Sequence, residues 1–407
     1  MKLVLAAALV TALALAGSRF SFLHLPLAGV RGSLWVRNIL LTGTEFIFIG
    51  LLLGSPFLGI LDDMTLVGLA PILGMGLSWI GLLFGIQWQV RRWDGVVRSG
   101  LLPALVQAGV VAVIITVPFY FLLRWSLDLS HAWCLVGALT LGAAGSDTAQ
   151  SALALVGRSA RGEGRALARL LRLVADLDGL VAVVVFGAVC WLPVLHGDTG
   201  SVGLWAALSV GLGVVMGLVV VALTSYQLAE EELLLVLLGT VFSGGGLALY
   251  LSLSPLFVNA VTGAVVANLS QERVLRSLQS LLVRGDRSVY VLFLLLAGAQ
   301  WHPSGWSVLL LAGAYLMLRT TGKLAGNWLA FRGVVAPAVR GHMGLGLLSH
   351  GGLAIAVVVN LQQIHDGGSP VVDAVTTIVL VGVIVSELFS PALVWRVLGG
   401  ARPMPSS

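Results

Sequence analysis

Leu141-Gly142-Ala143-Ala144-Gly145-Ser146-Asp147-Thr148 places a carboxylate directly after a run of small residues, inside an apolar stretch of helical length. An isolated ionised carboxylate in such surroundings is costly unless it is paired, hydrated or protonated. We interpret the stretch as an interruption in a helix, with Asp147 at the break. The alternative is an ordinary glycine contact between two packed helices.

Composition predicts a membrane protein. Of the 407 residues, 58% are hydrophobic and only 10% are charged, and the mean hydropathy is +1.01. A soluble protein of this length could not hide that much apolar surface. Charged side chains inside membrane helices are rare and typical of ion paths. The residues of interest are therefore Asp147, Asp176, Asp178, Arg319 and Lys323.

Apolar stretches of about 20 residues, the length needed to cross the hydrocarbon, recur along the chain. We predict an all-α polytopic membrane protein with about thirteen transmembrane helices. Their expected ranges are 2–17, 38–60, 65–88, 100–123, 132–156, 166–193, 201–225, 233–251, 254–269, 288–301, 305–331, 342–362 and 370–397.

The positions of the arginines predict the orientation of the chain in the membrane, because basic loops stay in the cytoplasm. They gather in alternate predicted loops, such as those around 91–98, 158–172 and 273–287, and the intervening loops hold almost none. This pattern predicts an N-terminus outside and a C-terminus in the cytoplasm. It also accounts for the net charge of +5 without any nucleic acid.

The ends of the chain allow a simple domain prediction. Residues 2–17 form an Ala/Leu run that fits a retained helix or, alternatively, a signal peptide. We expect one transmembrane domain over residues 1–398 and a short cytoplasmic tail over 399–407, with no soluble regulatory domain. Cys134 and Cys190 lie in apolar helix and are interpreted as small buried hydrophobes.

A second interruption is predicted at Leu348-Ser349-His350-Gly351-Gly352. Seven helices separate the starts of the two interrupted helices, so these two helices should run in opposite directions across the bilayer. That arrangement is expected of inverted-topology repeats whose unwound segments cross near the midplane. A glycine contact between packed helices is again the alternative.

Two more carboxylates lie in the stretch 166–193, in Asp176-Leu177-Asp178-Gly179. Residues two apart differ by about 200° around a helix, so the two carboxylates cannot both face one cavity. We predict that Asp178 faces Asp147 across the break and that Asp176 lies nearer the cytoplasm. Asp176 could instead pair with Arg172, four residues earlier.

The stretch 305–331 supplies the opposite charge, since Arg319 and Lys323 share a helix face at the i, i+4 spacing. One of them is expected to pair with an acidic residue when no cation is bound, and an arriving cation would displace that pair. Lys323 could instead extend to the cytoplasmic interface. Glu45 and Glu387 also lie in apolar stretches, but we assign them to a dimer interface or to the headgroup level.

Five segments, taken in order, resemble the monovalent cation:proton antiporter superfamily in its second branch, which holds the Kef-type and NapA-type exchangers. The segments are residues 50–56, 82–88, 257–268, 319–330 and 346–354. The resemblance covers nearly the whole chain. It implies an inverted-repeat fold of the NhaA or NapA kind with two crossing broken helices, a homodimer, and a place in the inner membrane of a bacterium.

The resemblance also implies roles for single residues. The family's second helix-six aspartate, which binds cation and proton, would stand at Gly179, and Asp178 matches only the first position. With one carboxylate in place of a pair, electroneutral exchange is favoured unless Asp176 compensates. Arg319 or Lys323 matches the basic partner of the acidic site. His350 stands where glutamine is common, as a titratable group or a hydrogen-bonding ring.

We therefore expect a secondary antiporter that exchanges Na⁺ or K⁺ for H⁺ by alternating access. The alternative is a non-transporting or regulatory homologue, which the glycine at position 179 favours. We expect no enzyme, since HExxH and GxSxG motifs are lacking, and neither a cofactor nor a metal beyond the transported cation. The expected site comprises the ion-binding residues Asp147, Asp178, Asp176, Ser146 and Thr148, the counter-charges Arg319 and Lys323, and the crossing residues Gly145, Ser349, His350, Gly351 and Gly352.

Overall fold

The computed structural model describes residues 2–19, 43–55, 57–90, 100–149, 163–197, 199–226, 228–302, 305–333, 337–365 and 369–397. Within these ranges the fold is helical and contains no β-strand. The helices are α1 (Lys2–Arg19), α3 (Glu45–Leu53), α4 (Asp63–Gly68), α5 (Ala70–Ile86), α6 (Leu102–Leu127), α7 (His131–Ser146), α9 (Glu163–Cys190), α10 (Val202–Leu223), α11 (Glu230–Tyr250), α12 (Pro255–Leu269), α13 (Glu272–Ala299), α14 (Trp306–Ala330), α15 (Pro337–Met343), α16 (Gly352–Ile364) and α17 (Pro370–Val397), with 3₁₀ turns η5 (Pro193–His196) and η6 (Gly344–Leu347).

Helix length and hydropathy agree with an integral membrane protein. In the described part of the chain, six helices are long and apolar enough to cross a membrane, namely α6, α9, α10, α11, α14 and α17. A seventh such span is possible if residues 340–347 and α16, which meet at a bend of 51°, are counted together. Helices α1, α5 and α12 are apolar but shorter. The predicted number of thirteen spans is therefore not confirmed.

Two predicted helices have different bounds in the structure. The helix expected over 38–60 ends at Leu53, because Gly54 is extended and Pro56 disfavours a helical residue before it. The helix expected over 288–301 begins much earlier, at Glu272, so Arg273, Arg276, Arg284 and Arg287 lie on α13 and not in a loop. The first half of α13 buries Leu275, Leu278 and Leu282 on one face, and such an amphipathic helix escapes a search for continuous apolar runs.

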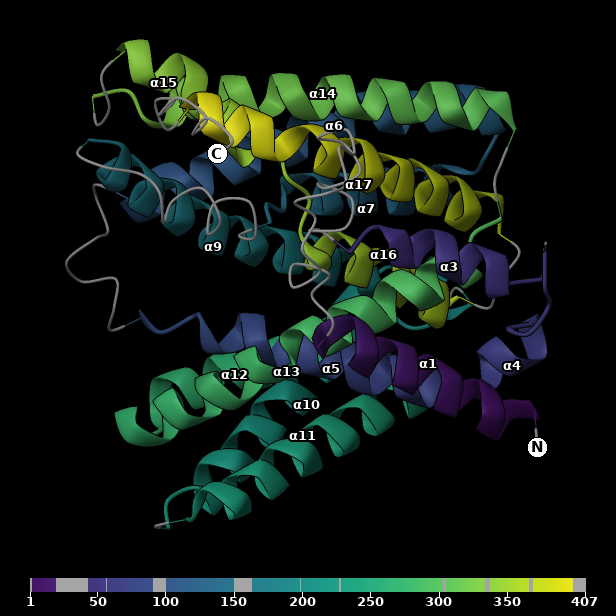
Figure 1. Ribbon diagram of the computed structural model, residues 1–407, viewed down its shortest axis with the longest axis vertical. Coiled ribbons are helices and arrows are strands. Elements are labelled where there is room, and N and C mark those ends of the chain that lie inside the picture. The colour runs from purple at the N-terminus through teal and green to yellow at the C-terminus, as the bar shows by residue number, and fades with distance from the viewer. Residues whose placement is uncertain are drawn as a thin grey trace, which may run out of the picture.

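The helices form two groups, seen in Figure 1. Helices α6, α7, α14 and α17 lie together in the upper part, and α1, α5, α10, α11, α12 and α13 lie in the lower part, with α9 and α16 between them. Small residues let α5 and α12 pack backbone to backbone: a Cβ added to Gly263 of α12 would lie 2.7 Å from the Leu82 carbonyl oxygen. The site lies in the upper group, where α7 and α16 each end or begin at a break.

Candidate functional site

The first break follows α7. This helix ends at Ser146, and Asp147 is extended, with φ −63° and ψ 147°. Most of α7 is buried, so its last carbonyl groups need partners inside the protein. The end of the predicted helix 132–156, beyond residue 149, lies outside the described residues.

The second break separates η6 from α16. The turn η6 ends at Leu347, Gly351 is extended, and α16 begins at Gly352. The predicted interruption at 348–352 therefore coincides with a break in the structure. Hydrogen bonds join the two breaks: Ala149 N donates to the Ser349 carbonyl oxygen at 3.2 Å, and Ser349 Oγ donates to the Ala149 carbonyl oxygen at 3.0 Å.

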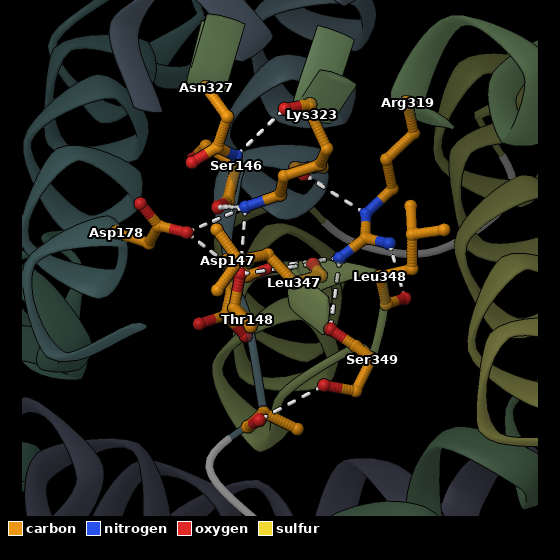
Figure 2. A network of polar contacts seen from close by, with 12 residues as sticks. Ser146, Asp147, Thr148, Asp178, Arg319, Lys323, Asn327, Leu347, Leu348 and Ser349 are labelled. Atoms are coloured by element: carbon orange, nitrogen blue, oxygen red, sulfur yellow. Dashed lines mark hydrogen bonds and ion pairs between the residues drawn. The ribbon is translucent and has the colours of Figure 1, made fainter. Parts of the chain in front are cut away.

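Arg319 of α14 binds the carbonyl groups of both breaks (Figure 2). Its Nε donates to Gly145 at 3.0 Å and its Nη1 to Leu348 at 2.6 Å, while Nη2 donates to Asp147 at 2.8 Å and Ser349 at 3.0 Å. The ends of α7 and η6 carry partial negative charge, which favours a cation there. All four acceptors are backbone oxygens, so Arg319 connects the breaks and is not hydrogen-bonded to a carboxylate of a described residue.

Lys323, one turn further along α14, forms the ion pair of the site (Figure 2). Its ammonium lies 2.6 Å from Asp178 Oδ2, 2.7 Å from the Ser146 carbonyl oxygen and 2.7 Å from Thr148 Oγ1. An ammonium has three donors, so all of them are used. The side chain is fully buried, and the alternative in which Lys323 extends to the cytoplasmic interface is wrong.

The three acidic residues occupy different places. Asp178 of α9 is fully buried and accepts a hydrogen bond from Thr148 Oγ1 at 2.7 Å. Its hydrogen bond to the first break therefore comes from Thr148 and not from Asp147. Asp147 accepts a hydrogen bond at 3.2 Å from the Ala354 backbone, at the amino end of α16, where partial positive charge favours a carboxylate. Asp176 is partly exposed, on the opposite face of α9 from Asp178.

The structure explains the glycine at position 179. A Cβ built there would lie 2.8 Å from Cδ1 of Phe84 and 3.4 Å from Cδ2 of Leu353. Phe84 of α5 therefore fills the space that a side chain at position 179 would need. An aspartate at this position would clash unless Phe84 moved or became smaller.

A cavity of about 440 Å³ reaches the site from the side of α5 and α13. Asp147, Thr148, His350 and Gly351 line it at the breaks, and its other lining includes Gln87, Asp286 and Arg287. Asp178, Lys323 and Arg319 are not part of its lining. Among the fully buried carboxylates of the described residues, Asp147 therefore lines the cavity, whereas Asp178 and its ion-pair partner Lys323 do not.

A second polar group, which sequence reasoning missed, surrounds His350. The Nε2 atom of His350 lies 3.0 Å from Tyr315 Oη, and its Nδ1 atom lies 3.1 Å from Ser386 Oγ of α17. The next residue, Glu387, is 2% exposed. The assignment of Glu387 to a dimer interface or the headgroup level is therefore wrong. Its carboxylate in an apolar stretch was a visible signal, but nothing in the pattern indicated that α17 turns it inward.

Comparison with known proteins supports the fold. The structure is similar to that of the sodium proton antiporter MjNhaP1 from Methanocaldococcus jannaschii at pH 8, with a TM-score of 0.65 over 98% of this chain and 100% of that one. Sequence identity is 14%, so the likeness concerns the fold. No protein-family model and no curated protein sequence matches the chain. The chain therefore shares the fold of that antiporter, and the predicted branch of the superfamily is not confirmed.

Proposed function

We propose that this protein exchanges a monovalent cation, Na⁺ or K⁺, for H⁺ across a membrane. The observation that carries the proposal is the position of Asp147. Its carboxylate is 1% exposed, lines the cavity, and forms no ion pair with a described residue. A buried carboxylate in that position is stabilised by either a bound cation or a proton, so the two compete for it.

The surroundings of Asp147 suit this competition. The amino end of α16 provides a backbone N–H beside the carboxylate. Arg319 and Lys323 hold the carbonyl oxygens of both breaks, so those breaks keep their shape while the ion at Asp147 changes. Asp178 neutralises Lys323 in this arrangement and supports the site from behind.

Alternating access would move one group of helices against the other. The two breaks belong to the group with α6, α7, α14 and α17, and the cavity lies between the breaks and helices α5 and α13. A rigid-body movement at this boundary would close the cavity on one side and open it on the other. We propose a homodimer in a bacterial inner membrane, with the C-terminus in the cytoplasm and residues 1–398 as one transmembrane domain.

The test is cation-induced proton flux in proteoliposomes, measured with Na⁺ and with K⁺ over a range of pH. Wild type should show flux with at least one cation, and Asp147→Asn should abolish it. Glu45→Gln serves as a matched control, because Glu45 is a carboxylate in apolar α3 that does not line the cavity. We expect this control to retain flux.

A second function is favoured by one observation, the filling of the position-179 space by Phe84. A non-transporting homologue would keep the fold and its buried pairs without exchanging ions. Folded wild type that moves neither Na⁺ nor K⁺ at any pH would establish this second function and exclude the first.

A further inference from the structure

Glu387 is a buried carboxylate that the proposed exchange does not yet use. It lies on α17 and is 2% exposed. Neither oxygen of its carboxylate has a hydrogen-bond partner among the described residues. A buried carboxylate without such partners is costly, so its presence calls for a nearby positive charge.

The charged and titratable groups around Glu387 come from four parts of the fold. Ser386 Oγ, on the residue before Glu387, lies 3.1 Å from His350 Nδ1, so α17 brings Glu387 next to the second break, whose carbonyl oxygens accept from Arg319. Arg319 and Asp147 therefore lie within electrostatic range of the Glu387 carboxylate. Tyr290 of α13 lies within the same range, and His350 lies at the second break. Arg319 is the only cation among them. Because its four hydrogen bonds to described residues all go to backbone carbonyl groups, the positive charge of Arg319 remains available to both Glu387 and Asp147.

Among the described residues, the buried side chains that carry negative charge outnumber those that carry positive charge. Three carboxylates, Asp147, Asp178 and Glu387, face two cationic side chains, Arg319 and Lys323. The His350 ring lies between two hydroxyl groups, which a neutral imidazole satisfies with one donor and one acceptor nitrogen. The site with all three carboxylates ionised therefore has a surplus of one negative charge.

We propose that Glu387 sets this surplus and so determines how strongly the site attracts a cation or a proton to Asp147. With Glu387 present, Arg319 is shared, and one monovalent cation or one proton at Asp147 makes the site neutral. Without it, Arg319 and Lys323 together balance Asp147 and Asp178, and an arriving cation would leave a net positive charge in the protein interior. Glu387 is thus a positioning residue that acts through Arg319. The inference rests on the proposed exchange function.

Glu387→Gln removes the charge and keeps the size of the side chain. We expect its apparent KM for the cation to rise about tenfold, and the pH of half-maximal flux to fall by about one unit, since loss of a neighbouring negative charge favours the ionised form of Asp147. Glu387→Asp keeps the charge, so its apparent KM and its pH of half-maximal flux should be close to those of wild type. Glu45→Gln is the matched control and should leave both unchanged.

A Glu387→Gln protein with wild-type KM and pH profile would overturn the inference while leaving the exchange function intact. A wild type without flux would overturn both.

Discussion

The ammonium of Lys323 lies 2.6 Å from the carboxylate of Asp178, and both side chains are completely buried. Thr148 joins this pair from the first break, accepting from Lys323 and donating to Asp178, each at 2.7 Å. Removing one partner of a buried ion pair leaves the other charge uncompensated. The pair is therefore expected to stabilise the packing of α9 and α14 against the break.

Asp178→Asn should lower the free energy of unfolding by about 3–5 kcal/mol, because Lys323 would lose its anion in a dry environment. Thermal unfolding of the protein in detergent measures this change. Lys323→Met in the same chain removes the stranded charge, so the double variant should be more stable than Asp178→Asn alone. If the two substitutions instead lower the free energy of unfolding by independent amounts that add in the double variant, Asp178 and Lys323 do not stabilise each other.

Gly351→Ala should weaken cation-driven flux strongly. A Cβ at this position would lie 3.0 Å from Cγ of Asp147 and closer still to Oδ2, so the carboxylate would have to turn away from the amino end of α16. The backbone at Gly351 has φ −88°, which alanine adopts without strain, so the effect is steric. Gly313→Ala on α14 meets nothing within 4 Å and is the control for flux. Wild-type flux in Gly351→Ala would exclude this orientation of Asp147.

Gly179→Asp alone should destabilise the protein and not increase flux, because Phe84 occupies the space of the new side chain. Overpacking of this kind costs about 1–3 kcal/mol. Combining it with Phe84→Ala provides the missing volume, and the double variant should unfold at a higher temperature than Gly179→Asp. If Gly179→Asp is as stable as wild type, Phe84 yields easily and the steric explanation of this glycine fails.

Arg319→Lys should destabilise both breaks although it preserves the charge. A lysine ammonium cannot reproduce the planar fork that reaches four carbonyl oxygens on two segments. Each carbonyl left without a partner costs about 1–3 kcal/mol. Arg273→Lys on the exposed face of α13 is the matched control. Similar unfolding temperatures for the two variants would contradict the prediction.

Several features of the fold could be predicted from local sequence because their cause is local. The apolar stretches that became α6, α10, α11 and α17 were recognisable, since the length of a membrane helix follows from the thickness of the hydrocarbon. The glycine-rich stretch before Asp147 and the one at 348–352 indicated breaks, because such residues interrupt helices. Amphipathic α13 was only half recognised, because its first turns alternate charged and apolar faces.

The sequence by itself determined that the chain is apolar along its length and that charged side chains occur in a few helices, and it indicated where α7 ends and where α16 begins. Only the tertiary structure decided how those charges are paired. The i, i+4 spacing placed Arg319 and Lys323 on one face but could not show that Arg319 binds carbonyl groups and Lys323 binds Asp178. It could not show that Glu387 turns inward or that Phe84 fills the space at position 179, because both depend on contacts between helices far apart in the chain.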